Sequence, residues 1–196
     1  MIISHKRKFI FARTPKAGTS SVIRALFPGK TKMLWHNHES LSEIKDLVDS
    51  EIYESYFKFT FVRNPWDRLV SRYAWGCLHN TDSLPRPPRV HSTSGSVFLD
   101  FTDYIKNINE DRFGVFIQNQ WNYAHECVFI GKFENLQEDF NVVCDNIGIS
   151  RKKLPRINKS KHKHYTEYYD EETKQIVAEK YAKDIEMFGY EFGNSQ

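Results

Sequence analysis

The 196-residue chain has only three cysteines and no apolar run long enough to cross a membrane. Cys77, Cys127 and Cys144 are odd in number and lack metal-site spacing, so we expect reduced, mostly buried thiols in a cytoplasmic compartment. The N-terminal stretch lacks the apolar region of a signal peptide. The sequence has no internal repeat and no low-complexity segment. These absences favour a soluble protein without disulfides and without a membrane span.

An excess of charge of one sign is also missing. With 28 Lys and Arg against 25 Asp and Glu, the net charge of +3 is too small to predict a nucleic-acid partner. The hydrophobic content of 40% is ordinary for a globular protein, and the length suffices for a well-packed core. We therefore predict one domain over residues 1–196. The aromatic content of 15% is high and suggests a dense core with an aromatic-lined cleft.

Predicted strands alternate with predicted helices along the chain. Apolar runs indicate buried strands at 9–12, 56–62 and 127–131, with a further candidate at 32–35. Amphipathic patterns and capping residues indicate helices at 22–27, 40–48, 65–77, 98–108, 113–125, 135–147 and 170–188. Residues 151–164 are predicted to be a basic loop, and 81–96 either a mobile lid or acceptor-binding loop, or a surface loop. This order predicts an α/β fold, a three-layer sandwich whose central parallel sheet is flanked by helices.

The first candidate site follows the strand at 9–12. Gly18 permits a tight turn there, and a helix begins just after it. A helix N-terminus presents unpaired N–H groups and a partial positive charge, and the lysine in the turn adds a full one. An anion cradle is therefore predicted from Lys16, Ala17, Gly18, Thr19, Ser20 and Ser21.

The second candidate site follows the strand at 56–62. Arg63 stands at the strand end, Asn64 can cap the next helix, and Ser71 lies two helical turns further on. Ligands of open α/β sheets bind at the carboxyl ends of strands, so two anion sites would lie side by side if these strands are neighbours. That arrangement suits a nucleotide with phosphates at two positions of its ribose. The GxxxxGK[ST] pattern of nucleotide hydrolases does not fit, because Lys16 precedes Gly18 and no acidic residue clearly ends a strand to hold Mg²⁺.

These segments resemble a known family. Pro15-Lys-Ala-Gly-Thr-Ser-Ser21 is similar to the 5′-phosphosulfate loop of sulfotransferases that use 3′-phosphoadenosine-5′-phosphosulfate (PAPS). The stretch Phe59-Thr-Phe-Val-Arg-Asn-Pro-Trp-Asp-Arg-Leu-Val-Ser-Arg-Tyr73 resembles their 3′-phosphate motif. Phe129-Ile-Gly-Lys-Phe-Glu-Asn-Leu136 and Asp184-Ile-Glu-Met-Phe-Gly-Tyr190 look like the carbohydrate (Golgi-type, family 2) branch, which includes heparan sulfate 2-O-sulfotransferases and small bacterial members. The resemblance covers most of the chain and implies the P-loop-like α/β sulfotransferase fold.

The resemblance also implies roles for single residues. Lys16 would stabilise the leaving 5′-phosphate, and Arg63 and Ser71 would bind the 3′-phosphate. His36-Asn-His38 stands where the 2-O-sulfotransferases carry a His-x-His pair. We expect His38 to be the general base, with His36 as a substrate contact or second candidate. Lys161, in the basic loop, would close over the nucleotide, and no metal is implied.

The acceptor is less well defined. The resemblance favours a carbohydrate, with Arg86, Arg89 and Gln120 as candidate contacts beside His36. A lipid-linked glycan or a small hydroxylated metabolite is the alternative acceptor. A small-molecule kinase and a non-catalytic glycan- or nucleotide-binding module are the alternative functions. We expect either a cytoplasmic enzyme of bacterial type or a catalytic domain separated from its membrane anchor, and the sequence does not indicate an oligomeric state.

Overall fold

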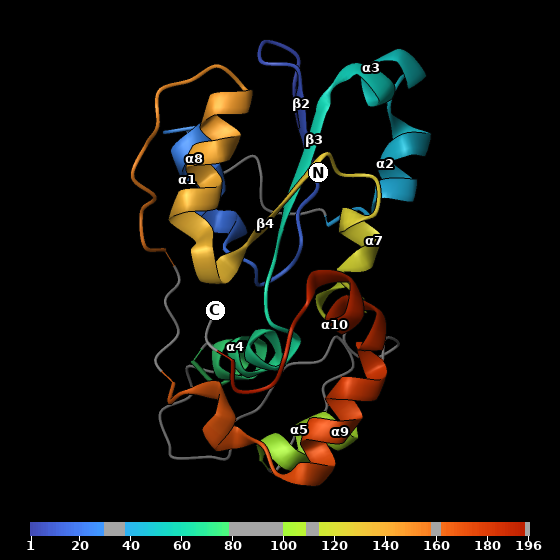
Figure 1. The fold of residues 1–196 in the computed structure, drawn as a ribbon, viewed down its shortest axis with the longest axis vertical. Helices are drawn as coiled ribbons and strands as arrows, with labels where there is room; N and C mark the ends of the chain where they lie inside the picture. The colour runs from blue at the N-terminus through green and yellow to red at the C-terminus, as the bar shows by residue number, and fades with distance from the viewer. Residues whose placement is uncertain (30–37, 79–99, 109–113, 158–161, 195–196) are drawn as a thin grey trace. The chain divides into compact units, whose positions relative to one another are not determined.

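The computed structural model describes residues 1–29, 38–78, 100–108, 114–157 and 162–194. The described residues form two compact units, shown in Figure 1. The first unit takes its residues from 1–63 and 120–157, and the second from 64–119 and 162–194.

The first unit is built on a sheet of four strands among the described residues, in the order β1-β2-β3-β4. Its strands are β1 (Ile2–Ser4), β2 (Phe9–Phe11), β3 (Phe57–Val62) and β4 (Phe129–Lys132). β2, β3 and β4 run parallel, which confirms the predicted central sheet, whereas β1 pairs with β2 antiparallel. The sequence prediction did not include β1.

Helices cover both faces of this sheet (Figure 1). One face carries α1 (Thr19–Leu26) and α8 (Leu136–Asn146), and α8 follows the short 3₁₀ turn η2 (Phe133–Asn135). The other face carries α2 (Leu41–Leu47), α3 (Ser50–Ser55) and α7 (Trp121–Ala124). A capping box formed by Ser40 and Glu43 opens α2, where the sequence predicted a helix over 40–48. The three-layer arrangement is therefore confirmed within this unit.

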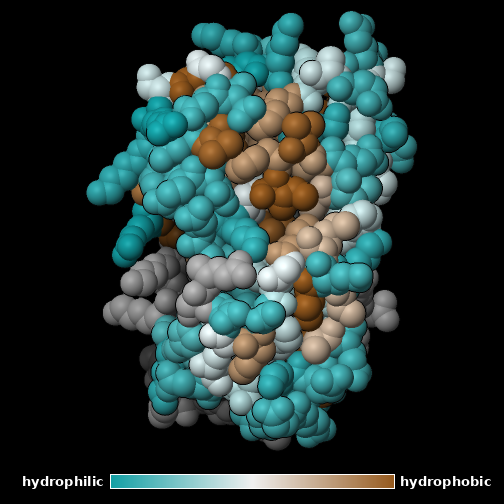
Figure 2. Space-filling view, in the orientation of Figure 1, coloured by the Kyte–Doolittle hydropathy of each residue, from teal (hydrophilic) through white to brown (hydrophobic). Residues whose placement is uncertain are grey.

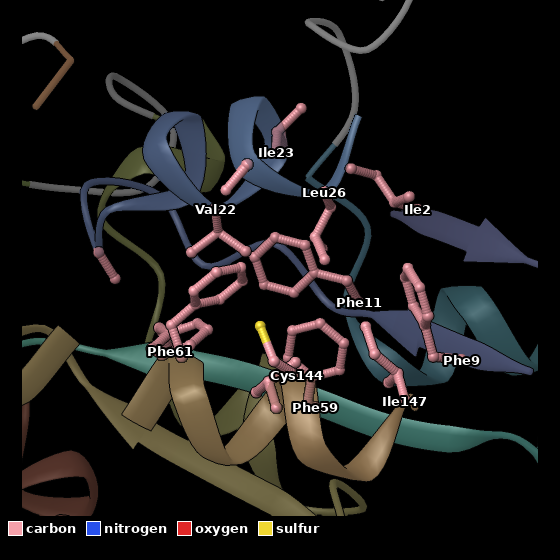
Figure 3. Packing of buried hydrophobic residues seen from close by; sticks show 14 residues of the cluster. Ile2, Phe9, Phe11, Val22, Ile23, Leu26, Phe59, Phe61, Cys144 and Ile147 are labelled. Carbon is pink, nitrogen blue, oxygen red and sulfur yellow. The ribbon is translucent and has the colours of Figure 1, made fainter. Parts of the chain in front are cut away.

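Alternation along the strands sorts the apolar side chains between the two faces. Phe9 and Phe11 pack towards α1 and α8, whereas Ile10 packs with residues of α2, α3 and α7. Figure 3 shows the first cluster, in which Phe11 and Phe59 lie between the two helices. Their rings are stacked with centroids 4.8 Å apart. Burial of these aromatic rings stabilises the pairing of β2 with β3.

β4 is an edge strand of the described sheet, and its surface is more apolar than its surroundings. Val128, which immediately precedes it, is 72% exposed. Figure 2 shows hydrophobic side chains gathered over this strand, with hydrophilic side chains around them.

The second unit consists of helices around an aromatic core. Its elements are α4 (Pro65–Leu78), α5 (Phe101–Lys106), the 3₁₀ turns η1 (Gly114–Phe116) and η3 (Tyr165–Tyr168), α9 (Glu171–Lys180) and α10 (Ala182–Phe188). Asn64 caps α4 as expected, because its side-chain oxygen accepts a hydrogen bond from the Trp66 N–H at 3.1 Å. Trp66, Leu69 and Tyr181 are among the buried residues of this core.

Two predicted helices are wrong in extent. The helix predicted at 113–125 is replaced by η1 and the short α7, because side chains take the backbone carbonyls between them. The Tyr181 hydroxyl donates to the Ile117 carbonyl at 2.7 Å, and Arg68 donates to the Gln118 carbonyl at 2.7 Å. The helix predicted at 170–188 breaks into α9 and α10 at Tyr181, whose φ of −112° and ψ of 25° leave the helical region.

The predicted strand at 32–35 and the loop at 81–96 lie outside the described residues. Where the basic segment 151–164 is described, it has no helix or strand, as expected. Within the described parts of the chain, no helix is both long enough and apolar enough to cross a membrane.

Candidate active site

The loop between β2 and α1 has an unusual backbone. Lys16 has a φ of +67° and Gly18 a φ of +78°. Left-handed conformations cost a residue with a side chain about 1–2 kcal/mol, so surrounding structure must hold Lys16 in place. Two such residues in one turn are typical of a concave backbone that binds anions. The first turn of α1 contains no acidic residue, so no carboxylate there offsets the positive end of the helix.

Gly18 has a second requirement besides its positive φ. A Cβ atom on this residue would lie 2.7 Å from Leu136 Cδ2 and 3.2 Å from Phe133 Cδ2. Real Cβ contacts are longer than the first of these, so a Cβ at this position would displace the end of the Leu136 side chain, whereas glycine lets the loop approach the start of α8 without such a shift.

Three threonines fix the path of the loop. The Thr19 hydroxyl donates to the Thr14 carbonyl at 2.8 Å, and the Thr60 hydroxyl donates to the Ala12 carbonyl at 2.7 Å. The hydroxyls of Thr14 and Thr60 are 2.9 Å apart. Because the single hydroxyl proton of Thr60 goes to Ala12, Thr14 must be the donor in that pair. These hydrogen bonds connect the loop to β3. Because the Thr19 hydroxyl proton is already donated to Thr14, the backbone amide of Thr19 is the group that can donate to an anion.

Arg63, from the second predicted anion site, contacts the loop that forms the first. It stands at the end of β3, is only 7% exposed, and donates from Nη1 to the Lys16 carbonyl at 3.2 Å. Its guanidinium carbon lies 4.0 Å from the centre of the Phe133 ring. β2 and β3 are parallel neighbours, so their carboxyl ends meet at one edge of the sheet, as the prediction required.

Gln120 holds the backbone of Arg63. Its Oε1 accepts from the Arg63 N–H, and its Nε2 donates to the Arg63 carbonyl, both at 2.8 Å. The side chain is fully buried. Gln120 therefore supports the backbone of Arg63. The substrate contact expected for Gln120 stays a prediction.

His38 is held as a neutral imidazole. Its Nδ1 lies 2.6 Å from the Arg13 carbonyl oxygen, which can only accept, so Nδ1 carries a proton, and in the neutral ring the lone pair is then on Nε2. Burial, with a smaller contribution from the charge of Arg13, lowers the pKa of His38 to about 4 against the favourable effect of this hydrogen bond. The Arg13 guanidinium is itself buried, which lowers its pKa. A neutral ring with its lone pair at Nε2 is what a general base requires.

The remaining candidate residues lie in the first unit, in the second unit or outside the described residues. In the first unit, Ala17 is fully buried, Ser20 is partly exposed, and the Ser21 N–H donates to the Gly18 carbonyl at 3.0 Å. Ser71 is buried on α4, in the second unit. The other candidates lie outside the described residues: His36, Arg86, Arg89 and Lys161.

Sequence reasoning missed two contributors. Arg13 acts on His38 through its backbone carbonyl, and no side-chain pattern could reveal that. Phe133 lies inside a segment that was recognised by resemblance, but the sequence did not indicate a role for it. Among the residues that the structure describes, no group of three or more His, Cys, Asp or Glu side chains could hold a metal ion, and the absence of a metal stays a prediction.

Fold and site together define an α/β protein in which two neighbouring parallel strands end in turns that bring Lys16 and Arg63 together. A sequence model described as "Sulfotransferase family" matches residues 1–191, and the chain belongs to that family. Carbohydrate sulfotransferase 10 from Xenopus laevis is 25% identical over 237 residues, covering 97% of this chain and 67% of the relative. The Danio rerio protein of the same name is 26% identical over 240 residues, with 97% and 66% covered.

Carbohydrate sulfotransferase 14 from Danio rerio is 22% identical over 231 residues, covering 100% of this chain and 63% of the relative. These relatives confirm the resemblance to the carbohydrate branch. The chain spans about two thirds of the length of these curated relatives. No solved structure matches it.

Proposed function

We propose that this protein transfers a sulfuryl group from PAPS to a hydroxyl of a carbohydrate acceptor. One observation carries the proposal: the guanidinium of Arg63 is hydrogen-bonded at 3.2 Å to the left-handed loop that contains Lys16. Two cationic side chains and a helix N-terminus are thereby gathered at one edge of the sheet. Membership of the sulfotransferase family supports this function over phosphoryl transfer.

The chemistry of the loop fits an anionic donor. Lys16 supplies a full positive charge, and the backbone amides at the start of α1 point outward along the helix axis, as anion-binding helices require. Arg63 offers a planar guanidinium, the group best suited to phosphate oxygens. Bound here, PAPS would supply an activated sulfuryl group and leave adenosine 3′,5′-bisphosphate behind. In this proposal Lys16 and the loop hold the 5′-phosphate, and Arg63 holds the 3′-phosphate.

His38 prepares the acceptor in the proposed reaction. Its Nε2 takes the proton of the acceptor hydroxyl while the new oxygen–sulfur bond forms and the bond between sulfur and the 5′-phosphate oxygen breaks. Lys16 stabilises the negative charge that gathers on the leaving phosphate. A bound anion also favours the imidazolium, so it raises the pKa of His38 from its low value in the free protein and makes the base stronger when the donor is present.

The acceptor class and the extent of the catalytic domain are part of the same proposal. Relatives named carbohydrate sulfotransferases support a carbohydrate acceptor. The family match runs from residue 1 to residue 191 and so includes residues of both units. We therefore infer that residues 1–196 act as one catalytic domain.

Purified protein assayed with PAPS and a panel of oligosaccharides tests this function. We expect release of adenosine 3′,5′-bisphosphate together with labelled sulfate on a glycan. Lys16→Ala should lower kcat by about 10²–10³, since one stabilising group at the leaving oxygen is lost. Lys8→Ala is the matched control, because Lys8 also has a positive φ (+50°) but is exposed in the turn between β1 and β2. It should leave kcat unchanged.

The His38→Asn variant removes the proposed base but should keep a hydrogen bond to the Arg13 carbonyl. The asparagine amide can still donate to the Arg13 carbonyl, but nothing replaces Nε2. We expect kcat to fall by about 10²–10⁴ while the melting temperature stays close to that of the wild type. Full activity in both Lys16→Ala and His38→Asn would refute the assigned roles. Transfer of phosphate from Mg²⁺–ATP, without sulfate transfer from PAPS, would refute the function.

A further inference from the structure

We infer that Phe133 is a positioning residue for donor binding, which sets the Arg63 guanidinium against the Lys16 loop. The inference rests on the proposed function, since it concerns the same nucleotide site. It also gives a role to the 129–136 segment, whose resemblance to the carbohydrate branch came without one.

A single ring contacts both halves of the proposed site. Phe133 lies under the guanidinium of Arg63, with 4.0 Å from the guanidinium carbon to the ring centre. The same ring, at Cδ2, is 3.2 Å from the place that a Cβ of Gly18 would occupy. A guanidinium stacked on an aromatic face keeps its N–H groups in its own plane, where they can reach oxygen acceptors at the edge. Above the Phe133 ring, Arg63 Nη1 donates to the Lys16 carbonyl at 3.2 Å.

The turn that carries Phe133 is itself fixed on both sides. The Lys132 N–H donates to Asp139 Oδ2 at 2.6 Å, and Asn135 Nδ2 donates to Asp139 Oδ1 at 3.1 Å. One carboxylate of α8 therefore holds the residues on either side of the ring. A Cβ on Gly131 would lie 2.5 Å from Phe61 Cε1, so glycine lets β4 approach β3 closely just before the turn. Phe133 is placed before any ligand arrives.

Ordinary core packing does not explain this ring. Phe133 is partly exposed and does not belong to the apolar clusters of the first unit, whereas Phe129 in the same segment packs against the cluster between α1 and α8. In the described part of the chain, the Phe133 ring contacts the Arg63 guanidinium and lies close to the backbone of Gly18. An arginine without such a platform must be ordered when its anion binds, and that ordering lowers affinity.

Calorimetry with two nucleotides tests the inference. Adenosine 3′,5′-bisphosphate has the phosphate assigned to Arg63, and adenosine 5′-monophosphate lacks it. Phe133→Leu should weaken bisphosphate binding about tenfold, the size of a partly desolvated cation–π contact, and monophosphate binding by less than about twofold. Phe133→Tyr should restore the affinity. Phe129→Leu is the matched control and should change neither affinity by more than about twofold.

A double mutant shows whether the ring acts through Arg63. In an Arg63→Ala background, Phe133→Leu should cause no further loss of bisphosphate affinity. Equal losses for both nucleotides, or an undiminished loss in the Arg63→Ala background, would contradict the inference while leaving the proposed function intact. A wild-type protein that binds the two nucleotides equally well would contradict the proposed function itself. The two failures are thus distinguishable.

Discussion

At the scale of single residues, the protonation of His38 has consequences that can be measured. Its pKa is lowered to about 4 by burial, from an ordinary value of 6.5, so the ring is neutral at every pH near neutrality. Only the neutral ring can accept the proton of an acceptor hydroxyl. Because kcat/KM reports the free enzyme, we expect it to stay level as the pH falls to about 5 and to decline only as the pH falls through about 4.

The pH dependence of kcat should differ, because it reports the complex with donor. A bound anion raises the pKa of His38, so the acid limb of kcat should lie at higher pH than that of kcat/KM. Initial rates over a range of acidic buffers would show both limbs. An acid limb of kcat/KM near pH 6.5 would contradict the assignment of His38 as a buried base.

The same group makes stability depend on pH. The unfolded chain binds this proton more tightly than the folded one, so the stabilising effect is present above pH 6.5 and is lost as the pH falls towards 4. Between pH 7 and pH 5 the free energy of unfolding should drop by about 2 kcal/mol more in the wild type than in His38→Asn. Urea unfolding at the two pH values gives this difference directly.

At the scale of elements, the connection from β2 to α1 depends on Gly18. Gly18→Ala meets two obstacles, a φ of +78° and a contact of 2.7 Å with Leu136. Gly148, with a φ of +66° and nothing within 4 Å of its Cβ position, meets only the first. We expect Gly148→Ala to cost about 1 kcal/mol of unfolding free energy, and Gly18→Ala about 1–3 kcal/mol more. Equal costs in denaturant unfolding would show that Leu136 adapts without penalty.

Local patterns predicted the elements whose signals are local. The apolar runs placed β2, β3 and β4, and capping residues placed the starts of α2 and α4. The segment 113–125 has an apolar pattern that favours a helix, but Tyr181 and Arg68, distant in sequence, take its carbonyls. The pattern within residues 113–125 cannot reveal hydrogen bonds from side chains so distant in the sequence.

In the candidate site, too, some contacts were predictable from the sequence and others were not. The approach of Lys16 and Arg63 follows from parallel strands and was predictable from the two motifs. The contacts of Phe133 and Gln120 with Arg63 arise from residues far along the chain. Gln120 was singled out by sequence, although its amide is bound to the Arg63 backbone.

At the scale of the whole molecule, ligand binding should raise stability by mass action. If the folded protein alone binds adenosine 3′,5′-bisphosphate, a concentration of about 100 times Kd adds about 2.7 kcal/mol to the free energy of unfolding. For a chain of this length the melting temperature should rise by about 5–10 °C. Thermal unfolding with adenosine 5′-monophosphate at the same concentration is the control. An equal shift with both nucleotides would argue against a dedicated 3′-phosphate site.

The hydrogen bonds between Gln120 and Arg63 join the two ends of the stretch formed by residues 64–119. The chain leaves the first unit directly after Arg63 and returns to it at Gln120. Two hydrogen bonds of 2.8 Å therefore join the point of departure to the point of return. Residues 64–119 thus leave and re-enter the first unit at two points that are already held together, so the cost in chain entropy of bringing those ends together is met within the sheet-containing unit. Insertions and deletions within this excursion should then leave the geometry at the end of β3 unchanged.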